Sequence, residues 1–168
     1  MWCVLRADPG KEQNLFEVCR KEMDGRTLFD VFQFTGEQMK RYEGSWHLEK
    51  RRLFPLDIFF ETLNIEELIK KMGTYAHMAQ KDEQGSFIRA LSTEEEQFLM
   101  KLCGKEHYLS MSRGFIKDGI THVTQGPLKG WENRICKIDR HKRTAKIKAP
   151  TEWLQQSFVA GLEIVSKS

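Results

Sequence analysis

The sequence contains no long hydrophobic run, and its mean hydropathy of −0.54 is that of a polar chain. A membrane-spanning helix needs about 18 or more apolar residues in succession, so we expect no membrane span. Residues 1–8 also lack the basic segment and apolar stretch of a secretory signal peptide. The sequence therefore predicts a cytoplasmic protein that makes no contact with a membrane.

Motifs for metal binding and catalysis are also missing. The four cysteines, Cys3, Cys19, Cys103 and Cys136, never occur as a CxxC pair, so they are expected to be free and mostly buried thiols. The five histidines show no HExxH spacing, and there is no Walker A, GxSxG or strand-linked GxGxxG motif. We therefore expect no enzyme, no cofactor and no metal site.

Charge is unevenly distributed along the 168 residues, although the net charge is only +3. Residues 1–113 hold 17 Lys and Arg against 19 Asp and Glu, whereas residues 114–168 hold 10 against 5. Within residues 129–148, eight basic residues accompany only two acidic ones. This asymmetry favours two units, of which the C-terminal one binds a polyanion.

Short apolar strands alternate with amphipathic helices in residues 1–104. The charged segment 40–53 interrupts this order and is expected to be a strand or a partly exposed excursion. Residues 73–90 are expected to form a hairpin. The order predicts the α+β class, with a split-βαβ sandwich in which helices cover one face of a sheet.

Two helix starts and one helix end in this part carry clear local signals. Asn64 with Glu67, and Ser92 with Glu95, have the spacing of capping residues, so a helix should begin after each pair. Gly104 should end the second of these helices.

The pattern changes after residues 105–113, which hold few periodic apolar residues and are expected to be a linker. Five short strand candidates with turn signals between them follow. They are residues 116–125, 133–139, 143–148, 153–159 and 162–165. Such a series predicts a small five-stranded β-barrel in residues 114–168.

The stretch Val123-Thr-Gln-Gly-Pro-Leu-Lys-Gly-Trp-Glu-Asn-Arg-Ile135 resembles a KOW motif. Gly126, Pro127 and Gly130 match the family pattern, and Asn133 stands where the family has its last glycine. Asn tolerates a left-handed backbone, so we expect the turn to be retained. The resemblance implies an SH3-like barrel.

The N-terminal part resembles the NGN domain of the NusG family of transcription elongation factors. Three segments in the right order carry the likeness. They are Trp2-Cys3-Val4-Leu5, for the family's Trp-Tyr-Val-Leu; Leu53-Phe54-Pro55 with Ile58-Phe59-Phe60-Glu61, for Phe-Pro-Gly-Tyr-Val-Phe-Ile; and Ala90–Glu96, for Pro-Leu-Ser-x-Glu-Glu. The implied domains are NGN over 1–104 and KOW over 114–168.

Three further segments resemble LoaP proteins, which are specialised NusG paralogues that promote processive antitermination on selected long operons. They are Ser112–Ile116, Lys137–Arg143 and Gly161–Val165. The resemblance implies a monomeric transcription antitermination factor that binds RNA polymerase and the nascent leader RNA.

By the same resemblance, the NGN domain binds the clamp helices of the polymerase β′ subunit. Phe59 falls at the family's gripping position, and Phe54 and Arg6 are further candidates. The family's Gly-Tyr is Leu56-Asp57 here, so a carboxylate at Asp57 implies an altered polymerase contact. Plain core packing is the alternative role for each aromatic residue.

RNA binding is expected from the basic C-terminal run, because phosphate contacts need Lys and Arg that reach solvent together. An RNA loop or hairpin suits such a patch better than duplex DNA. The candidates are Lys129, Arg134, Lys137, Arg140, His141, Lys142, Arg143, Lys146 and Lys148. A merely solvated charged face is the plain alternative.

A general NusG-type adapter is the rival function. Housekeeping NusG uses its KOW domain to bind ribosomal protein S10 or the Rho factor, and that role needs an exposed apolar patch. Ile135, Trp131, Phe158 and Leu162 could form one, or they could equally fill the barrel core.

Overall fold

The computed structural model describes residues 1–150 and 157–168. Within these residues the chain is a mixed α+β protein with three α-helices and several sheets. It divides into two compact units, each built from two stretches of chain: unit 1 is residues 1–33 and 54–96, and unit 2 is residues 34–53 and 97–168. No helix in the described part is long and apolar enough to cross a membrane.

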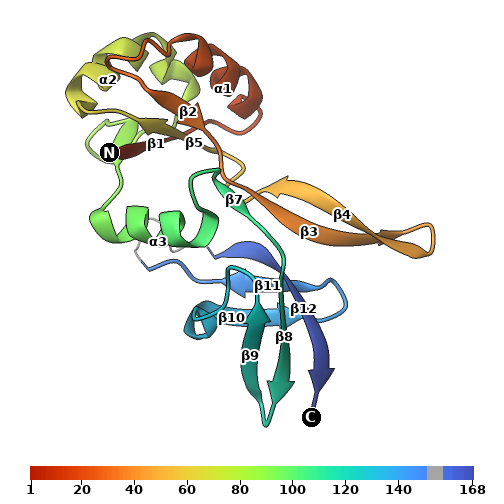
Figure 1. Cartoon of the computed structure of the whole chain (residues 1–168). Coiled ribbons are helices and arrows are strands. Elements are labelled where there is room, and N and C mark those ends of the chain that lie inside the picture. The colour runs from red at the N-terminus through yellow and green to blue at the C-terminus, as the bar shows by residue number, and fades with distance from the viewer. Residues whose placement is uncertain (151–156) are drawn as a thin grey trace. The chain divides into compact units, whose positions relative to one another are not determined.

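Unit 1 is built on a four-stranded antiparallel sheet in the order β2-β5-β1-β6 (Figure 1). Its strands are β1 (Trp2–Arg6), β2 (Asp30–Phe32), β5 (Asp57–Glu61) and β6 (Ile88–Ala90). The helices α1 (Glu12–Lys21) and α2 (Ile65–Met72) and the 3-10 helix η1 (Gly73–Met78) complete it. The third helix, α3 (Thr93–Cys103), starts in unit 1 and continues into unit 2.

The helices of unit 1 cover one face of the sheet because side chains alternate along each strand. Cys3 and Leu5 of β1 and Ile58 and Phe60 of β5 are fully buried against the apolar faces of α1 and α2. The other residues of the same strands therefore point to the opposite face. Phe59 lies there, as the sequence predicted.

The capping signals at Asn64 and Ser92 are confirmed. The Asn64 side chain accepts hydrogen bonds from the backbone N–H groups of Glu66 and Glu67 at the start of α2. At the start of α3, Ser92 and Glu95 form the reciprocal pair of a capping box, at 2.8 and 3.1 Å. Gly104 follows α3 with a φ of 68°, so the helix ends at the predicted residue.

Unit 2 contains a five-stranded sheet in the order β10-β11-β12-β8-β9 and a three-stranded sheet in the order β4-β3-β7. The first consists of β8 (Ser112–Lys117), β9 (Ile120–Gln125), β10 (Ile135–Asp139), β11 (Thr144–Ile147) and β12 (Phe158–Lys167), with the 3-10 helix η2 (Glu132–Arg134) before β10. The second consists of β3 (Thr35–Tyr42), β4 (Ser45–Arg52) and β7 (Tyr108–Leu109).

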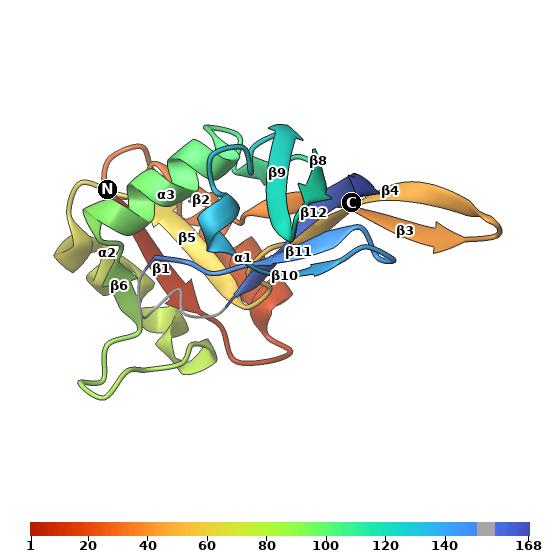
Figure 2. The ribbon, with the colours of Figure 1, turned by 90° about the horizontal axis from the view of Figure 1, so that it is seen from below.

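The strands β3 and β4 form a long hairpin whose tip extends past the β10–β11 turn in both ribbon views (Figures 1 and 2). Glu37 anchors its base: one carboxylate oxygen accepts from the Tyr108 hydroxyl and the other from the Met111 N–H, both at 2.8 Å. The backbone of β3 also approaches β12 closely at Gly161, where an added Cβ would lie 2.6 Å from the carbonyl oxygen of Glu37.

Several expectations differ from the structure. Residues 73–90 do not form a hairpin: η1 precedes a turn at Asp82–Gly85, and β6 is the single strand there. The predicted strand 116–125 is split between β8 and β9, because Asp118 and Gly119 both have positive φ and turn the chain. Residues 158–165 belong to the continuous strand β12, and the predicted strand 153–159 lies partly outside the described residues.

Two further segments also differ from the expectation. The expected linker 105–113 contains β7, which pairs with β3. Asn133 is in η2 and is not among the residues with positive φ, so its tolerance of the left-handed region is not used. Gly126 and Gly130 do have positive φ, of 97° and 88°.

Candidate nucleic-acid interface

The two units differ more in net charge than residues 1–113 and residues 114–168 do. Unit 1 holds 9 Lys and Arg against 15 Asp and Glu, whereas unit 2 holds 18 against 9. The hairpin residues 34–53 belong to unit 2 and add five basic residues to it. A net charge of +9 on one compact unit produces a positive potential that attracts polyanions.

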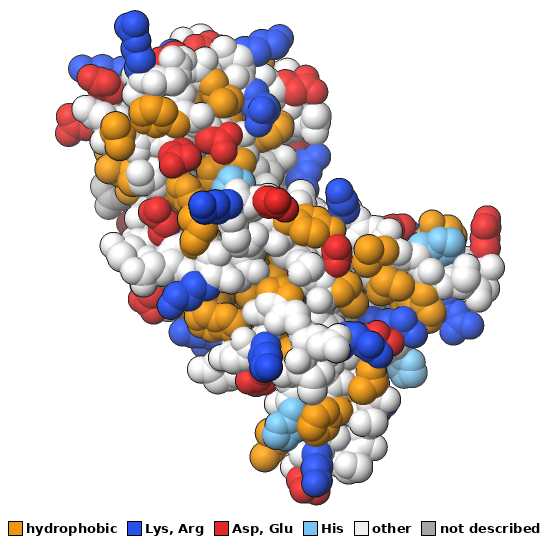
Figure 3. Space-filling view, viewed as in Figure 1, with side chains coloured by type: hydrophobic (Ala, Val, Ile, Leu, Met, Phe, Trp, Pro, Cys, Tyr) orange, Lys and Arg blue, Asp and Glu red, His pale blue; other side chains and the backbone are white. Residues whose placement is uncertain are grey.

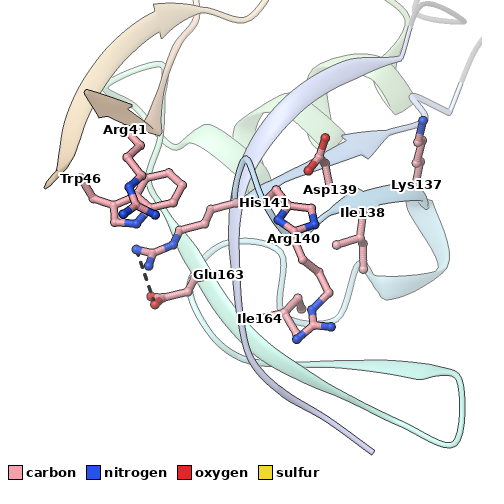
Figure 4. A pocket seen from close by; sticks show the side chains of 10 residues that line it. Arg41, Trp46, Lys137, Ile138, Asp139, Arg140, His141, Glu163 and Ile164 are labelled. Atoms are coloured by element: carbon pink, nitrogen blue, oxygen red, sulfur yellow. Dashed lines mark ion pairs between the residues drawn. The ribbon is translucent and has the colours of Figure 1, made fainter. Parts of the chain in front are cut away.

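The basic side chains of unit 2 gather where the hairpin faces the β10–β11 turn. Two adjoining hollows of about 880 and 390 Å³ lie there, and they share Arg41, Trp46 and His141. We call them together the basic hollow (Figure 4). The first is also lined by Lys137, Ile138, Asp139, Arg140, Arg143, Glu163 and Ile164, and the second by Gln38, Met39, Lys40, Arg51, Lys142 and Thr144.

Positive charge dominates this hollow. Seven Lys and Arg side chains line it, and Asp139 and Glu163 are its two carboxylates. Asp139 also has a local role, because its side chain accepts a hydrogen bond from the Lys142 N–H and shapes the turn. On the visible face of the hairpin, blue Lys and Arg side chains lie beside orange hydrophobic ones (Figure 3).

Arg143 connects the turn to the hairpin. Its guanidinium carbon lies 4.1 Å from the centre of the Trp46 ring, which is cation–π distance, and its Nη1 is 3.7 Å from Glu163. Its φ of 54° is in the left-handed region, which costs a side chain other than glycine roughly 1–2 kcal/mol. Arg143 therefore has an unfavourable backbone and a well-oriented side chain.

Like charges also face each other inside the five-stranded sheet. Lys137 on β10 is the register partner of Lys146 on β11, and both are exposed. Directly opposed like charges destabilise a strand pair. An anion bound beside them would remove that repulsion, so this pair favours an anionic ligand near the basic hollow.

The structure brings together five of the nine predicted RNA-binding residues. Lys137, Arg140, His141, Lys142 and Arg143 all line the basic hollow. The remaining four do not line it. Lys146 is on β11, Lys148 follows that strand, Arg134 is half-buried in η2, and Lys129 is exposed in the loop after β9.

The hairpin residues of the hollow were missed as site residues. Lys40, Arg41 and Arg51 were noted only as part of a charged segment, and Trp46 was not singled out. The local signal was a run of basic residues around an aromatic one. No sequence pattern joins that run to a turn about 95 residues further along the chain.

The four predicted polymerase-binding residues lie in unit 1, on the sheet face opposite α1 and α2. Phe59 is fully buried and packs against Phe32 and Phe54, at ring-centre distances of 5.8 and 6.0 Å. Trp2 extends this aromatic cluster, with its ring centre 5.3 Å from that of Phe32. Packing within this cluster is the observed role of Phe54 and Phe59, and their binding to polymerase stays a prediction.

Arg6 and Asp57 pair with each other. They are register partners on β1 and β5, and two hydrogen bonds of 2.8 and 3.1 Å join the guanidinium to the carboxylate. Burial raises the pKa of Asp57, and the hydrogen bonds from Arg6 reduce this rise without cancelling it. The hydrogen bond to Asp57 in turn raises the pKa of Arg6. The Asp57 carboxylate therefore has an internal partner.

The apolar residues that could have formed a protein-binding patch are largely packed inside unit 2. Phe158 and Leu162 are buried, and Trp131 packs edge-on against Phe98, with ring centres 5.2 Å apart. Ile135 is half-buried. Exposed apolar side chains on the five-stranded sheet are instead Ile120, Val159 and Val165.

No protein-family model matches the chain, and no curated protein matches it significantly.

Proposed function

We propose that this chain is a NusG-type transcription elongation factor, related to LoaP, that binds RNA polymerase and promotes processive antitermination on selected operons in the cytoplasm. Residues 1–104 would be its NGN domain, residues 105–113 the linker and residues 114–168 its KOW domain. The C-terminal unit contacts nascent RNA. The sequence resemblances quoted above are the starting point for this proposal.

One observation carries the RNA-binding half of the proposal: unit 2 has a net charge of +9 and concentrates seven basic side chains around the basic hollow. Nucleic-acid phosphates are the ligands that such a surface attracts most strongly. Unit 1 has a net charge of −6, so it competes little for nucleic acid and suits a protein partner.

The fold supports the proposal at a coarser level. An antiparallel four-stranded sheet with α1 and α2 on one face agrees with a split-βαβ domain, and the five-stranded sheet of unit 2 has the number of strands expected for the small barrel. The other face of the first sheet carries the aromatic cluster of Trp2, Phe32, Phe54 and Phe59, whose side chains are buried against one another.

The test combines recovery of polymerase with transcription. The tagged full-length chain is purified from its own cells, and the bound proteins and RNA are identified. The chain is then added to polymerase transcribing a template that carries the recovered leader sequence and a terminator. We expect polymerase to be recovered and readthrough to increase. Arg140→Ala with Arg143→Ala should abolish the increase, whereas Lys117→Ala with Lys167→Ala, which removes as much charge elsewhere in unit 2, should not.

Two results would overturn the proposal. Failure to recover polymerase would remove its polymerase-binding half. Recovery of ribosomal protein S10 or Rho through unit 2, without bound leader RNA, would establish the adapter function instead.

A further inference from the structure

The basic hollow is formed by two segments that meet only in the folded chain. Arg41 and Trp46 are register partners on β3 and β4, so they lie at the same level of the hairpin. Arg140 and Arg143 come from the β10–β11 turn. Figure 4 shows Arg41 and Trp46 on the hairpin side and Arg140 and His141 on the turn side of the hollow.

Trp46 and Arg143 form a stacking surface before any ligand binds. The cation–π contact fixes the guanidinium near the indole, and the ion pair with Glu163 holds it from another side. Trp46 lines both parts of the hollow and is only half-buried, so part of its surface is open. Aromatic rings and guanidinium planes are the two surfaces on which proteins stack unpaired bases.

Uncompensated cations surround this surface. Among the described residues, Arg41, Arg140 and Lys142 form no ion pair, and all three are exposed. They come from both sides of the hollow. They are therefore available for the phosphates that precede and follow a base stacked between them.

We infer that the basic hollow binds one unstacked nucleotide of a single-stranded or loop RNA, with the base against Trp46 and Arg143 and the adjoining phosphates on Arg41 and Arg140. This inference deepens the proposed function and rests on it for RNA as the ligand. The hairpin is thus part of the RNA site together with the KOW residues. A fully paired RNA binds less well, because its bases are stacked inside the helix.

The test uses the full-length chain and a defined probe. RNA is selected from a pool of hairpins whose loops carry about ten random nucleotides. Binding of the enriched hairpin, and of a fully paired RNA that includes the same loop sequence, is measured by fluorescence anisotropy at several salt concentrations. Thermal unfolding confirms that each variant is folded.

We expect the loop RNA to bind more tightly than the paired RNA. Trp46→Ala should weaken loop binding by roughly five- to a hundredfold, which is the range for losing one stacked base, and Trp46→Phe should restore most of it. Arg41→Gln should weaken binding and reduce the slope of log affinity against log salt by about 0.7, as one phosphate contact is lost. The matched control Lys117→Gln, exposed on β8 away from the hollow, should leave loop binding nearly unchanged.

The possible failures are distinguishable. If the native chain binds loop RNA and Trp46→Ala binds it equally well, this inference is wrong and the proposed function stands. Equal losses from Trp46→Ala and Lys117→Gln would also overturn it, because only general charge attraction would remain. If the native chain binds no RNA, both this inference and the RNA-binding half of the proposed function are wrong.

Discussion

The guanidinium of Arg6 holds the carboxylate of Asp57 through two hydrogen bonds across β1 and β5. The two partners differ in exposure: the Asp57 side chain is 3% exposed and that of Arg6 is 26% exposed. Without Asp57, the arginine could still reach water. Without Arg6, the carboxylate would be a buried charge without this partner. Removing Arg6 should therefore reduce the stability of the fold more than removing Asp57.

We expect Arg6→Leu to reduce the free energy of unfolding by about 3 kcal/mol, which is typical for breaking a buried pair from one side. Asp57→Leu should reduce the free energy of unfolding by clearly less. The double variant Arg6→Leu with Asp57→Leu buries neither charge, so it should be more stable than Arg6→Leu alone. Urea unfolding of the three variants measures these differences, and equal losses in both single variants would contradict the asymmetry.

The Arg6→Leu variant should also depend on pH. Burial raises the pKa of Asp57, and loss of the two hydrogen bonds removes a contribution that lowers it. A carboxyl group with a raised folded-state pKa favours folding below its ordinary pKa, and this contribution is lost as pH rises through the raised value. The stability deficit of Arg6→Leu against the native chain should therefore be smallest in acid and grow toward neutral pH. A deficit that does not change with pH would show that Asp57 stays ionised when folded.

Packing between β3 and β12 gives the next prediction. A Cβ at Gly161 would overlap the Sδ of Met111 and lie 2.6 Å from the carbonyl oxygen of Glu37. Gly161→Ala should therefore destabilise the chain by about 1–3 kcal/mol and displace the hairpin, which weakens RNA binding at the basic hollow. The control Gly73→Ala, where φ is −54° and nothing lies within 4 Å of the new Cβ, should be neutral or slightly stabilising. Thermal unfolding and RNA binding would measure both effects.

Thiol reactivity should distinguish the exposed Cys136 from the three buried cysteines. Burial raises the pKa of Cys3 to about 11 and those of Cys19 and Cys103 to about 12, whereas Cys136 is exposed. Because the thiolate is the reactive form, iodoacetamide at about pH 8 should modify Cys136 alone in the folded chain. Mass spectrometry should show one adduct when folded and four in guanidinium. Rapid modification of Cys19 without denaturant would contradict its burial.

Alkaline pH should loosen the base of the hairpin. Burial and the hydrogen bond to Glu37 raise the pKa of Tyr108 to about 12 from its ordinary 10.0. The stabilisation from protonated Tyr108 is fully present below pH 10.0 and is lost as pH rises through the folded value of about 12. Stability measured by urea unfolding should therefore fall more steeply between these values in the native chain than in Tyr108→Phe. Parallel curves would show that this hydroxyl contributes nothing.

Local chemistry explains which parts of the fold were predictable. The caps at Asn64 and Ser92 and the end at Gly104 depend on residues within a few positions of each other, and all three were predicted correctly. The alternation that separates Phe59 from Ile58 and Phe60 is equally local. The split of residues 116–125 at Asp118 was missed, although an Asp-Gly pair is itself a hairpin signal.

The basic hollow depends on contacts that no local pattern contains. The charged segment 40–53 belongs to unit 2 because Glu37 binds Tyr108 and Met111 and because Gly161 lets β3 approach β12. Unit 2 is more basic than residues 114–168 alone, because residues 34–53 and residues 97–113 each add a net charge of +2 to it.

Arg143 allows stability and binding to be separated. Arg143→Gly relieves a left-handed backbone that costs roughly 1–2 kcal/mol, and it removes a cation–π contact that contributes about 0.5–1 kcal/mol and a partly exposed ion pair with Glu163 that contributes about 0–1 kcal/mol. The free energy of unfolding should therefore change little. RNA binding should nevertheless fall, because the stacking partner of Trp46 and one cation are gone. Asp118→Gly is the matched control: Asp118 has a φ of 52° in the β8–β9 turn, outside the basic hollow, so the substitution should not weaken RNA binding. Thermal unfolding and fluorescence anisotropy on the same samples would measure both effects. If the Arg143→Gly and Asp118→Gly variants bind RNA with equal affinity, Arg143 serves only the turn.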